Sequence, residues 1–170
     1  MSLSLYVLRH GKAELDAPHG GDHARPLRKR GRAAAKDVGL LLERLDEAPQ
    51  RVLSSNAVRA LETVELAREA GGWKAEVEAS RELYGAGPEK ILARLRAVEG
   101  TPARLLLVGH EPGLSGLVAL LTGGSPPVFP TAALARIDFE TAAWSEVGPG
   151  SGALAWLVFP RLLEAWRGTV

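Results

Sequence analysis

Two continuous apolar runs constrain the fold of this chain more than any other feature of its sequence. Leu3–Leu8 and Arg104–Val108 carry apolar residues at almost every position, without the polar alternation of a half-exposed strand. Strands of this kind belong inside a parallel sheet that helices cover on both faces. The sequence therefore predicts a three-layer α/β sandwich whose sheet is mostly parallel.

The segments around these runs alternate between helical periodicity and strand-like patterns. Two further short strands are expected at Arg51–Ser54 and Lys74–Glu78. Two helices are expected at Pro26–Leu45 and Pro88–Val98. A third should begin after Asn56, its N-cap, and end at Gly71-Gly72, and a fourth should have Pro112 at its first position.

Two segments near the end of the chain complete the predicted sheet. Ala133–Phe139 alternates apolar residues with Arg136 and Asp138, which is typical of an edge strand. Ala153–Phe159 is apolar throughout and is expected inside the sheet. No internal repeat or linker divides the chain, so a single domain over residues 1–170 is predicted.

Composition excludes several classes of function. The chain has no cysteine, which rules out disulfides, thiolate metal sites and thiol catalysis. Its 21 basic and 20 acidic residues give no net charge that would attract nucleic acid. No apolar run could span a bilayer, and Met1 leads directly into the first strand without room for a signal peptide. A cytoplasmic protein without nucleic-acid or membrane partners is expected.

Amide residues are scarce, with one asparagine and one glutamine in the whole sequence. This scarcity favours a thermophilic source, although a GC-rich genome would produce the same Arg, Ala and Gly bias.

Each of the two apolar runs ends on a glycine and a histidine. His10 and Gly11 follow the first strand after Arg9, and His110 follows the second. Ligands of open α/β sheets bind at the carboxyl ends of the strands. Gly11 allows close approach of the backbone, Arg9 can hold an anion through its guanidinium, and the free amides of the Pro112 helix would favour an anion.

Arg59 adds a second cation to this candidate site. It lies in the first turn of the predicted helix after Asn56, beside the end of the Arg51–Ser54 strand. Taken singly, Arg59 would be a solvated arginine and His110 a structural histidine. Two arginines, two histidines and helix-terminal amides that converge on one point describe a site for a dianionic phosphoryl group.

Four motifs in this order, "LRHG", "RPLRKRG", "SSNAVRALET" and "VGHEPGL", resemble the histidine phosphatase superfamily. The short chain is most similar to the SixA-type phosphohistidine phosphatases within it. The resemblance implies a phosphoglycerate mutase-like fold, a three-layer α/β/α sandwich with a mixed sheet of about six strands, one edge strand of which is antiparallel. It also implies that His10 is the nucleophile and that Arg9, Arg59 and His110 hold the phosphoryl oxygens, with Gly11 and Glu111 in the phosphate-binding motifs.

The chain departs from the family pattern at Lys12-Ala13-Glu14 and at Asn56, which stands where members often have proline. Many members carry Thr and Asn after the first motif, where this chain has Lys12-Ala13-Glu14, so the contacts of the mutase branch are not expected. Larger members insert a helical lid for which the segment from Gly71 to Pro88 is too short. The sequence therefore predicts no helical cap and an open pocket that suits a phosphorylated protein side chain better than a small sugar phosphate.

The chemistry of phosphoryl transfer sets further expectations. His10 must be neutral at one ring nitrogen to attack, and its other N–H needs an acceptor such as a backbone carbonyl. No metal or cofactor is required. His19 and His23, with Asp16 and Asp22 nearby, form either a metal site or, as the simpler interpretation, a polar rim.

The proton donor for a phosphate ester has three candidates. The family usually supplies a carboxylate after the third strand, which Glu82 matches, and Glu14 or Asp16 could reach the pocket from the first loop. Phosphohistidine could need no strong acid, because imidazole leaves readily once solvent has protonated it.

Three functions follow from these motifs. The first is a phosphatase that hydrolyses phosphohistidine on a protein through a phosphohistidine intermediate on His10. The second is a broad-specificity phosphomonoesterase whose substrates are small phosphate esters. The third is a non-enzymatic module that binds phosphorylated partners, against which the presence of both His10 and His110 argues.

Overall fold

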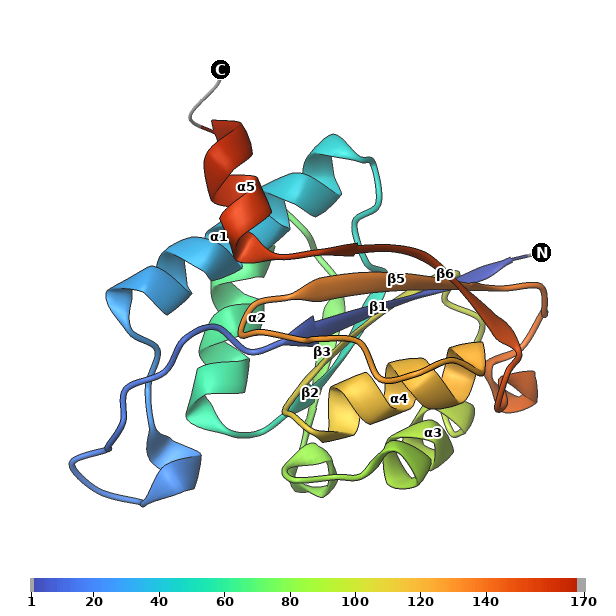
Figure 1. Cartoon of the computed structure of the whole chain (residues 1–170), viewed down its shortest axis with the longest axis horizontal. Helices are drawn as coiled ribbons and strands as arrows, with labels where there is room; N and C mark the ends of the chain where they lie inside the picture. The colour runs from blue at the N-terminus through green and yellow to red at the C-terminus, as the bar shows by residue number, and fades with distance from the viewer. Residues whose placement is uncertain (1, 168–170) are drawn as a thin grey trace.

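The computed structural model describes residues 2–167, in which a six-stranded sheet lies between two layers of helices (Figure 1). The strands are β1 (Leu3–Arg9), β2 (Arg51–Ser55), β3 (Glu76–Ser80), β4 (Arg104–Gly109), β5 (Leu134–Phe139) and β6 (Gly152–Val158). The α-helices are α1 (Lys29–Arg44), α2 (Val58–Gly71), α3 (Pro88–Arg96), α4 (Gly113–Thr122) and α5 (Pro160–Arg167). Three short 3₁₀ helices are η1 (Asp22–Ala24), η2 (Arg81–Leu83) and η3 (Trp144–Glu146).

The strand order in the sheet is β3-β2-β4-β1-β5-β6. β1, β2, β3 and β4 run parallel to one another, whereas β5 pairs antiparallel with both β1 and β6. The predicted sandwich with a mostly parallel mixed sheet of six strands is therefore confirmed. β1 and β4 are neighbours at the centre, so their carboxyl ends lie side by side.

Side chains of the central strands alternate between two apolar clusters. In β1, Leu5 and Val7 pack with residues of α3 and α4, while Tyr6 and Leu8 pack on the opposite face with residues of α1 and α2. All four of these side chains are fully buried. A strand that is buried on both faces needs apolar residues at every position, which explains the continuous apolar runs.

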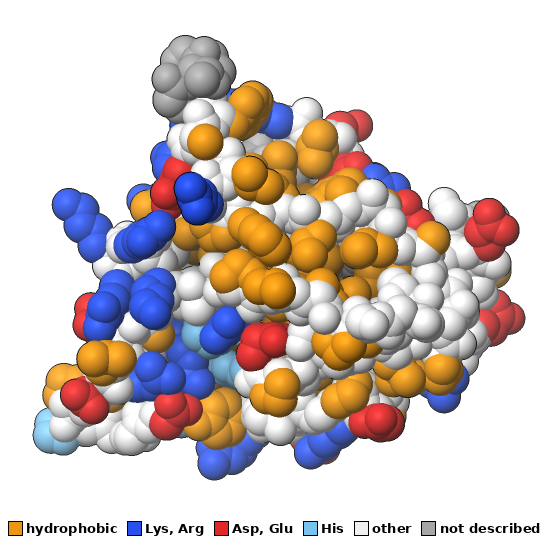
Figure 2. All heavy atoms as spheres, in the orientation of Figure 1, with side chains coloured by type: hydrophobic (Ala, Val, Ile, Leu, Met, Phe, Trp, Pro, Cys, Tyr) orange, Lys and Arg blue, Asp and Glu red, His pale blue; other side chains and the backbone are white. Residues whose placement is uncertain are grey.

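The positions expected for β5 and β6 are wrong. β5 lies inside the sheet, and β6 forms the edge, where Leu154 is 43% exposed. The polar residues of β5 are paired rather than solvated: Arg136 forms ion pairs with Glu47 and Asp138, and Ser4 donates to Asp138. Figure 2 shows apolar side chains gathered across the middle of the face on which β6 lies. The resemblance placed the antiparallel strand at an edge, and the structure places it one strand further in.

The start of α2 also differs from the prediction. Asn56 does not cap this helix, because Ala57 occupies the cap position and its N–H donates to Ser55 Oγ at 3.2 Å. The helix ends as expected, with Gly72 in a left-handed conformation (φ 67°).

The sequence analysis did not predict α5. This helix packs on α1 through an ion pair between Arg167 and the buried Asp37 (2.9 Å), and through Arg44, which stacks over the Trp166 ring at 4.8 Å. Among the described residues, no helix has the length and hydropathy needed to cross a bilayer.

Candidate active site

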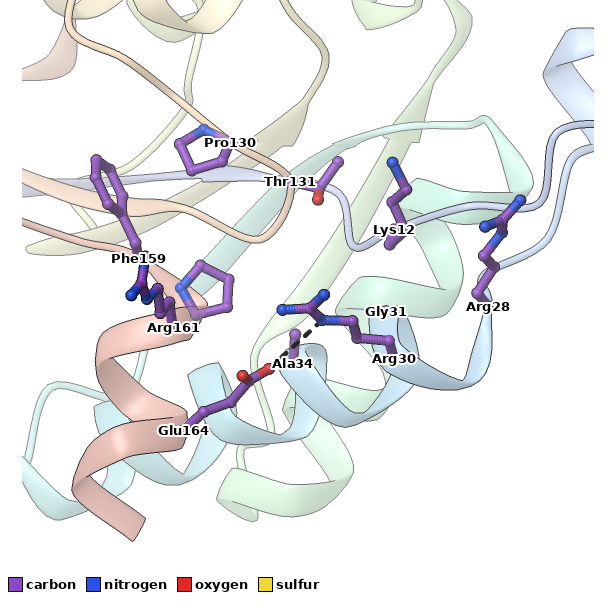
Figure 3. A pocket seen from close by; sticks show the side chains of 11 residues that line it. Lys12, Arg28, Arg30, Gly31, Ala34, Pro130, Thr131, Phe159, Arg161 and Glu164 are labelled. Carbon is purple, nitrogen blue, oxygen red and sulfur yellow. Dashed lines mark ion pairs between the residues drawn. The ribbon is translucent and has the colours of Figure 1, made fainter. Parts of the chain in front are cut away.

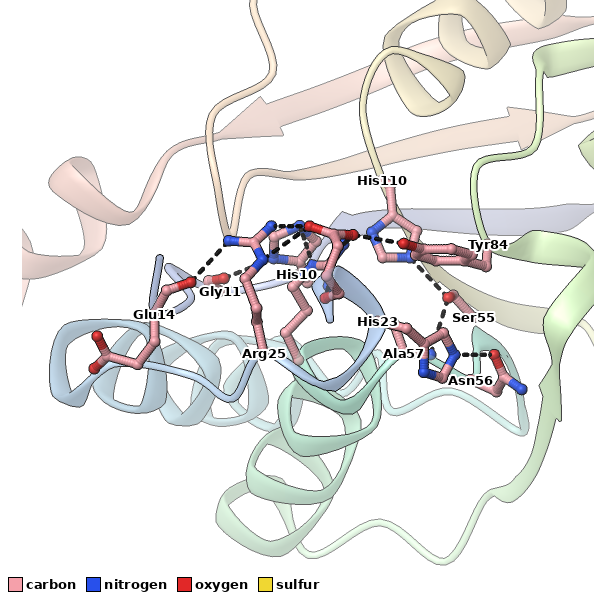
Figure 4. A network of polar contacts seen from close by, with 12 residues as sticks. His10, Gly11, Glu14, His23, Arg25, Ser55, Asn56, Ala57, Tyr84 and His110 are labelled. Atoms are coloured by element: carbon pink, nitrogen blue, oxygen red, sulfur yellow. Dashed lines mark hydrogen bonds and ion pairs between the residues drawn. The ribbon is translucent and has the colours of Figure 1, made fainter. Parts of the chain in front are cut away.

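The two histidines that follow the central strands lie next to each other. His10 comes directly after β1 and His110 directly after β4, and the two strands pair in register up to Arg9 and Gly109. The centroids of the two imidazole rings are 5.1 Å apart. Figure 4 shows the rings at the centre of a network of polar contacts that includes residues from the first loop and from the region of β2 and β3. The predicted convergence of these side chains is therefore found in the fold.

His10 is held in one tautomer. Its Nδ1 lies 2.7 Å from the carbonyl oxygen of Gly11, and a carbonyl only accepts, so Nδ1 carries the proton. The lone pair therefore lies on Nε2, where Arg59 Nε donates to it at 3.3 Å. Burial, together with His110 and the two arginines, lowers the pKa of His10 to about 3, so the ring is neutral at physiological pH.

Arg59 is buried in the first turn of α2 and contacts the first loop. Its Nη1 donates to the carbonyl of Asp22 (2.7 Å), and its Nη2 donates to Asp22 Oδ2 (3.0 Å). Tyr84 donates its hydroxyl to the same carboxylate oxygen at 2.5 Å. These contacts and that of Arg25, led by the Tyr84 hydrogen bond, hold the pKa of Asp22 well below its usual range. The cations of the site thus face an ionised carboxylate.

His110 has one satisfied and one unsatisfied ring nitrogen. Its Nε2 lies 2.7 Å from Ser55 Oγ, and its Nδ1 is buried with no hydrogen-bond partner among the described residues. Burial and the positive charge of Arg59 lower the pKa of His110 to about 4. The rings of His110 and Tyr84 are also nearly perpendicular, with centroids 5.4 Å apart.

Arg9 is anchored by the loop that precedes β5. Its Nη1 donates to the carbonyl of Phe129 at 2.9 Å, while its Nε is buried without a partner among residues 2–167. The same loop is tied to the end of β1, because the N–H of Ala132 donates to the carbonyls of Arg9 (3.1 Å) and His10 (3.0 Å). Burial lowers the pKa of Arg9, but a guanidinium keeps its charge at any physiological pH.

Gly11 is required by the close approach of α1. Its N–H donates to Thr63 Oγ1 at 3.0 Å, and a Cβ on Gly11 would lie 2.6 Å from the carbonyl oxygen of Gly31. Any larger residue would push α1 away from the end of β1. Thr63 in turn donates to the carbonyl of Arg59 (2.7 Å), so a chain of hydrogen bonds links Gly11 to the turn that carries Arg59.

Two of the amides at the start of α4 are already hydrogen-bonded within the fold, so, contrary to the prediction, they are not free for an anion. α4 begins at Gly113 after Pro112, and the N–H of Leu114 donates to the carbonyl of His110 at 3.1 Å. The next N–H, that of Ser115, donates to the carboxylate of Glu111 at 2.8 Å. The Glu111 side chain therefore caps this helix.

Within residues 2–167, no hydrogen bond or ion pair joins the carboxylates of the three candidate proton donors to His10, Arg59 or His110, although Arg25 donates to the carbonyl of Glu14 (Figure 4). Glu82 lies in η2 and is exposed, and its carboxylate makes no hydrogen bond or ion pair within residues 2–167. The Glu14 carboxylate pairs with Arg28 at 3.2 Å, and Asp16 is exposed.

Asp22 and Tyr84 reach Arg59 instead, although the sequence analysis gave neither a role at the phosphoryl site. For Asp22 the signal was its place in "GGDHARPL", just before a motif of the family.

The four histidines have different environments. His10 and His110 meet at the strand ends, His19 is exposed in the first loop, and Nε2 of His23 lies 2.7 Å from Asn56 Oδ1. In the described part of the chain, no group of three or more His, Asp or Glu residues is arranged to hold a metal ion. His23 and Asn56 form a polar rim beside Tyr84, whose ring lies 5.0 Å from that of His23.

The fold and the site together define a class of protein. It is a three-layer sandwich that carries two arginines and two histidines at the carboxyl ends of its central strands. The chain belongs to the histidine phosphatase superfamily, of which the branch 1 family model matches residues 5–84. The matched region contains His10 and Arg59, and His110 lies beyond it.

Relatives and solved structures agree with this assignment. An uncharacterised protein of Mycobacterium tuberculosis is 33% identical, with 91% of this chain and all of the relative aligned. The structure of the protein histidine phosphatase SixA in complex with tungstate is 31% identical, covers 95% of this chain and 99% of its own, and has a TM-score of 0.81. The structure of a phosphohistidine phosphatase SixA from Nakamurella multipartitia is 27% identical over 94% and 97% of the two chains, with a TM-score of 0.80. The fold is thus phosphoglycerate mutase-like and matches SixA structures.

Proposed function

We propose that this phosphatase hydrolyses phosphohistidine on a protein through a covalent phosphohistidine intermediate on His10. The observation that carries the proposal is the tautomer of His10, which is neutral, buried and held with its lone pair on Nε2, among two arginines and His110. An imidazole that only binds phosphate would serve better as a cation, whereas a nucleophile must be neutral.

Two buried donors without acceptors complement a phosphoryl group. Ser55 Oγ accepts the N–H of Ala57, so its own proton is free to donate to His110 Nε2, which leaves the proton of His110 on the unpartnered Nδ1. Arg9 Nε is the second donor. Buried donors of this kind are costly unless an acceptor arrives, and phosphoryl oxygens supply it.

The reaction proceeds by two in-line transfers. Nε2 of His10 forms a bond to phosphorus as the bond between phosphorus and the substrate nitrogen breaks, and the departing imidazole takes a proton from solvent. Arg9, Arg59 and His110 stabilise the charge on the equatorial oxygens. Water then forms a bond to phosphorus and gives up a proton to solvent as the bond between phosphorus and Nε2 breaks, so inorganic phosphate leaves and His10 regains its lone pair. Arg59 uses three of its five N–H donors on His10 and Asp22, so two remain for phosphoryl oxygens, although the Asp22 carboxylate offsets part of its charge.

The substrate class is inferred from the open site and from the SixA relatives. Between α2 and α3 the chain forms only β3 and η2, so no helical cap covers the histidines. A phosphorylated side chain on a protein surface would therefore meet no helical cap on its way to His10, which is 7% exposed. Glu82 is retained as the proposed proton donor for ester substrates, where an alkoxide must be protonated as it leaves.

The test compares kcat/KM for a phosphohistidine protein, p-nitrophenyl phosphate and a panel of sugar phosphates. We expect the phosphohistidine protein to be preferred, and a neutral quench during turnover to trap an acid-labile phosphoryl group on His10. His10→Asn should lose the label and at least about 10³-fold in rate. His19→Asn is the matched control, because His19 is exposed in the first loop, and it should keep both.

Two results would contradict the proposal at different levels. A fully active His10→Asn enzyme would rule out the covalent mechanism. A clear preference for small esters, with labelled His10, would identify the protein as a phosphomonoesterase instead.

A further inference from the structure

A pocket of about 510 Å³ lies between the start of α1, the start of α5 and the loop before β5 (Figure 3). Four cationic side chains and one carboxylate line it, and its remaining wall is largely apolar, with Phe159, Pro130 and Pro160. The cations are Lys12, Arg28, Arg30 and Arg161. Its volume is within the range of pockets that bind ligands, which is roughly 300–1,000 Å³.

The positive charge of this basic pocket is only partly balanced. Arg30 pairs with Glu164 across the pocket at 3.7 Å, as the dashed line in Figure 3 marks. Arg28 pairs with Glu14 at 3.2 Å. Lys12 and Arg161 are exposed and make no ion pair within residues 2–167. Figure 2 shows the same excess as Lys and Arg side chains gathered over the start of α1, next to the histidines.

The basic pocket shares its backbone with the active site. Lys12 follows His10 by two residues, which places their Cα atoms within about 7 Å of each other. Thr131 lines the pocket, and the next residue, Ala132, donates its N–H to the His10 carbonyl. α1 is also pressed against this segment, because a Cβ on Gly31 would lie 2.2 Å from the carbonyl oxygen of Lys12. A substrate segment that extends a few residues from a phosphoryl group at His10 would therefore be long enough to reach the pocket.

We propose that the basic pocket binds acidic side chains of the phosphoprotein substrate, a few residues away from its phosphohistidine. The inference rests on the proposed function and adds a sequence preference to it. The two unpaired cations select Asp or Glu through charge complementarity, and the apolar wall accommodates a neighbouring apolar side chain of the same segment. Exposed charge pairs of this type contribute modestly to affinity, so the pocket sets preference rather than the chemistry.

The kinetic test uses two phosphohistidine peptides of equal length, one with Glu around the phosphohistidine and one with Gln at the same positions. We expect the wild-type enzyme to favour the acidic peptide about three- to tenfold in kcat/KM at low salt, and high salt to remove the difference. Arg161→Glu should abolish the preference without slowing the neutral peptide. A glutamate in the first turn of α5 suits the helix dipole, so this variant should fold.

The matched control is Lys74→Glu, which reverses an exposed cation before β3, at the opposite end of the sheet. It should retain the wild-type preference. Equal rates for the two peptides in the wild-type enzyme, or an equal loss in both variants, would overturn the proposal.

A binding arm separates this inference from the proposed function. p-Nitrophenyl phosphate turnover without hydrolysis of either peptide would refute the phosphohistidine assignment alone. Fluorescence anisotropy with the unphosphorylated acidic peptide then decides about the pocket. The proposal for the pocket is supported if the wild-type enzyme binds this peptide, if Arg161→Glu weakens the binding about three- to tenfold, and if Lys74→Glu leaves the binding unchanged. No binding, or equal binding by both variants, would refute it.

Discussion

At the scale of single residues, burial decides the charge of the site. His10 is 7% exposed, and its pKa of about 3 and that of His110, about 4, keep both imidazoles neutral beside Arg9 and Arg59. Four adjacent cations would repel one another, whereas two neutral rings and two guanidiniums leave a moderate positive charge that Asp22 partly balances. The site is therefore ready for a dianion while its nucleophile stays unprotonated.

The same pKa values predict an acid-sensitive fold. An unfolded chain protonates its imidazoles near pH 6.5, but the native state protonates these two only near pH 3 and 4. Between these pH values the native state binds fewer protons than the unfolded chain, so the free energy of unfolding falls as the pH is lowered, by about 1.4 kcal/mol per pH unit for each imidazole. Urea denaturation from pH 6 to 4.5 should show a slope that is lower by about this amount in His10→Asn and unchanged in His19→Asn. An unaltered slope in His10→Asn would refute the assignment of a neutral His10.

At the scale of elements, close contact between α1 and α2 positions Arg59. A Cβ on Gly39 of α1 would lie 2.1 Å from the carbonyl oxygen of Ala67 in α2, and one on Gly71 would lie 2.7 Å from the Gly39 carbonyl oxygen. The two backbones therefore touch without intervening side chains. Since α2 carries Arg59 in its first turn, this contact determines how far the guanidinium reaches toward His10.

Gly39→Ala should therefore destabilise the protein. Overpacking of this kind costs about 1–3 kcal/mol, because the neighbouring atom is backbone and cannot rotate away. Gly116→Ala in α4 is the control, because a Cβ at this position would lie 3.3 Å from its nearest neighbour, Pro88 Cγ. Alanine also gains about 1 kcal/mol in helix propensity over glycine, so little change in stability is expected. Urea denaturation measures both, and a Gly39→Ala protein as stable as the wild type would show that the helices can separate freely.

At the scale of the whole molecule, the site joins segments that lie far apart in the sequence. β1, the first loop, the start of α2 and the end of β4 each supply a contact to His10, Arg59 or His110. An oxyanion held between them binds the native state and not the unfolded chain. Its binding must therefore stabilise the entire fold.

Tungstate or vanadate should raise the melting temperature. At 100 times its Kd, a ligand adds about 2.7 kcal/mol, which corresponds to about 5–10 °C for a chain of this size. The shift and the phosphatase activity should both persist in EDTA, and His110→Ala should reduce the shift. A metal requirement would appear as a loss of activity in EDTA that a divalent ion restores. Thermal denaturation followed by circular dichroism, with and without EDTA, measures the effect.

Local patterns in the sequence determined the architecture and the centre of the site. Continuous apolar runs require burial on both faces, so the layered fold followed from Leu3–Leu8 and Arg104–Val108. His10 and His110 follow the ends of two such strands, and Arg59 follows a third. Because the carboxyl ends of parallel strands lie at the same edge of a sheet, strand geometry alone predicted that these side chains lie close together. Chemistry also predicted a backbone acceptor for the N–H of His10, and the structure identifies it as the Gly11 carbonyl, facing Nδ1.

Only the tertiary structure decided the features that depend on distant partners. The alternation of Arg136 and Asp138 with apolar residues predicts an edge strand, because the local sequence does not reveal that Glu47, from a distant segment, pairs with Arg136. Asp22 reaches Arg59 because the first loop folds back over α2, 37 residues along the chain. Periodicity reports which face of an element is buried, but not which charged side chain another segment brings to it. The pairing of β5, the contact of the Asp22 carboxylate with Arg59, and the basic pocket all depend on segments that the tertiary structure brings together from distant parts of the sequence.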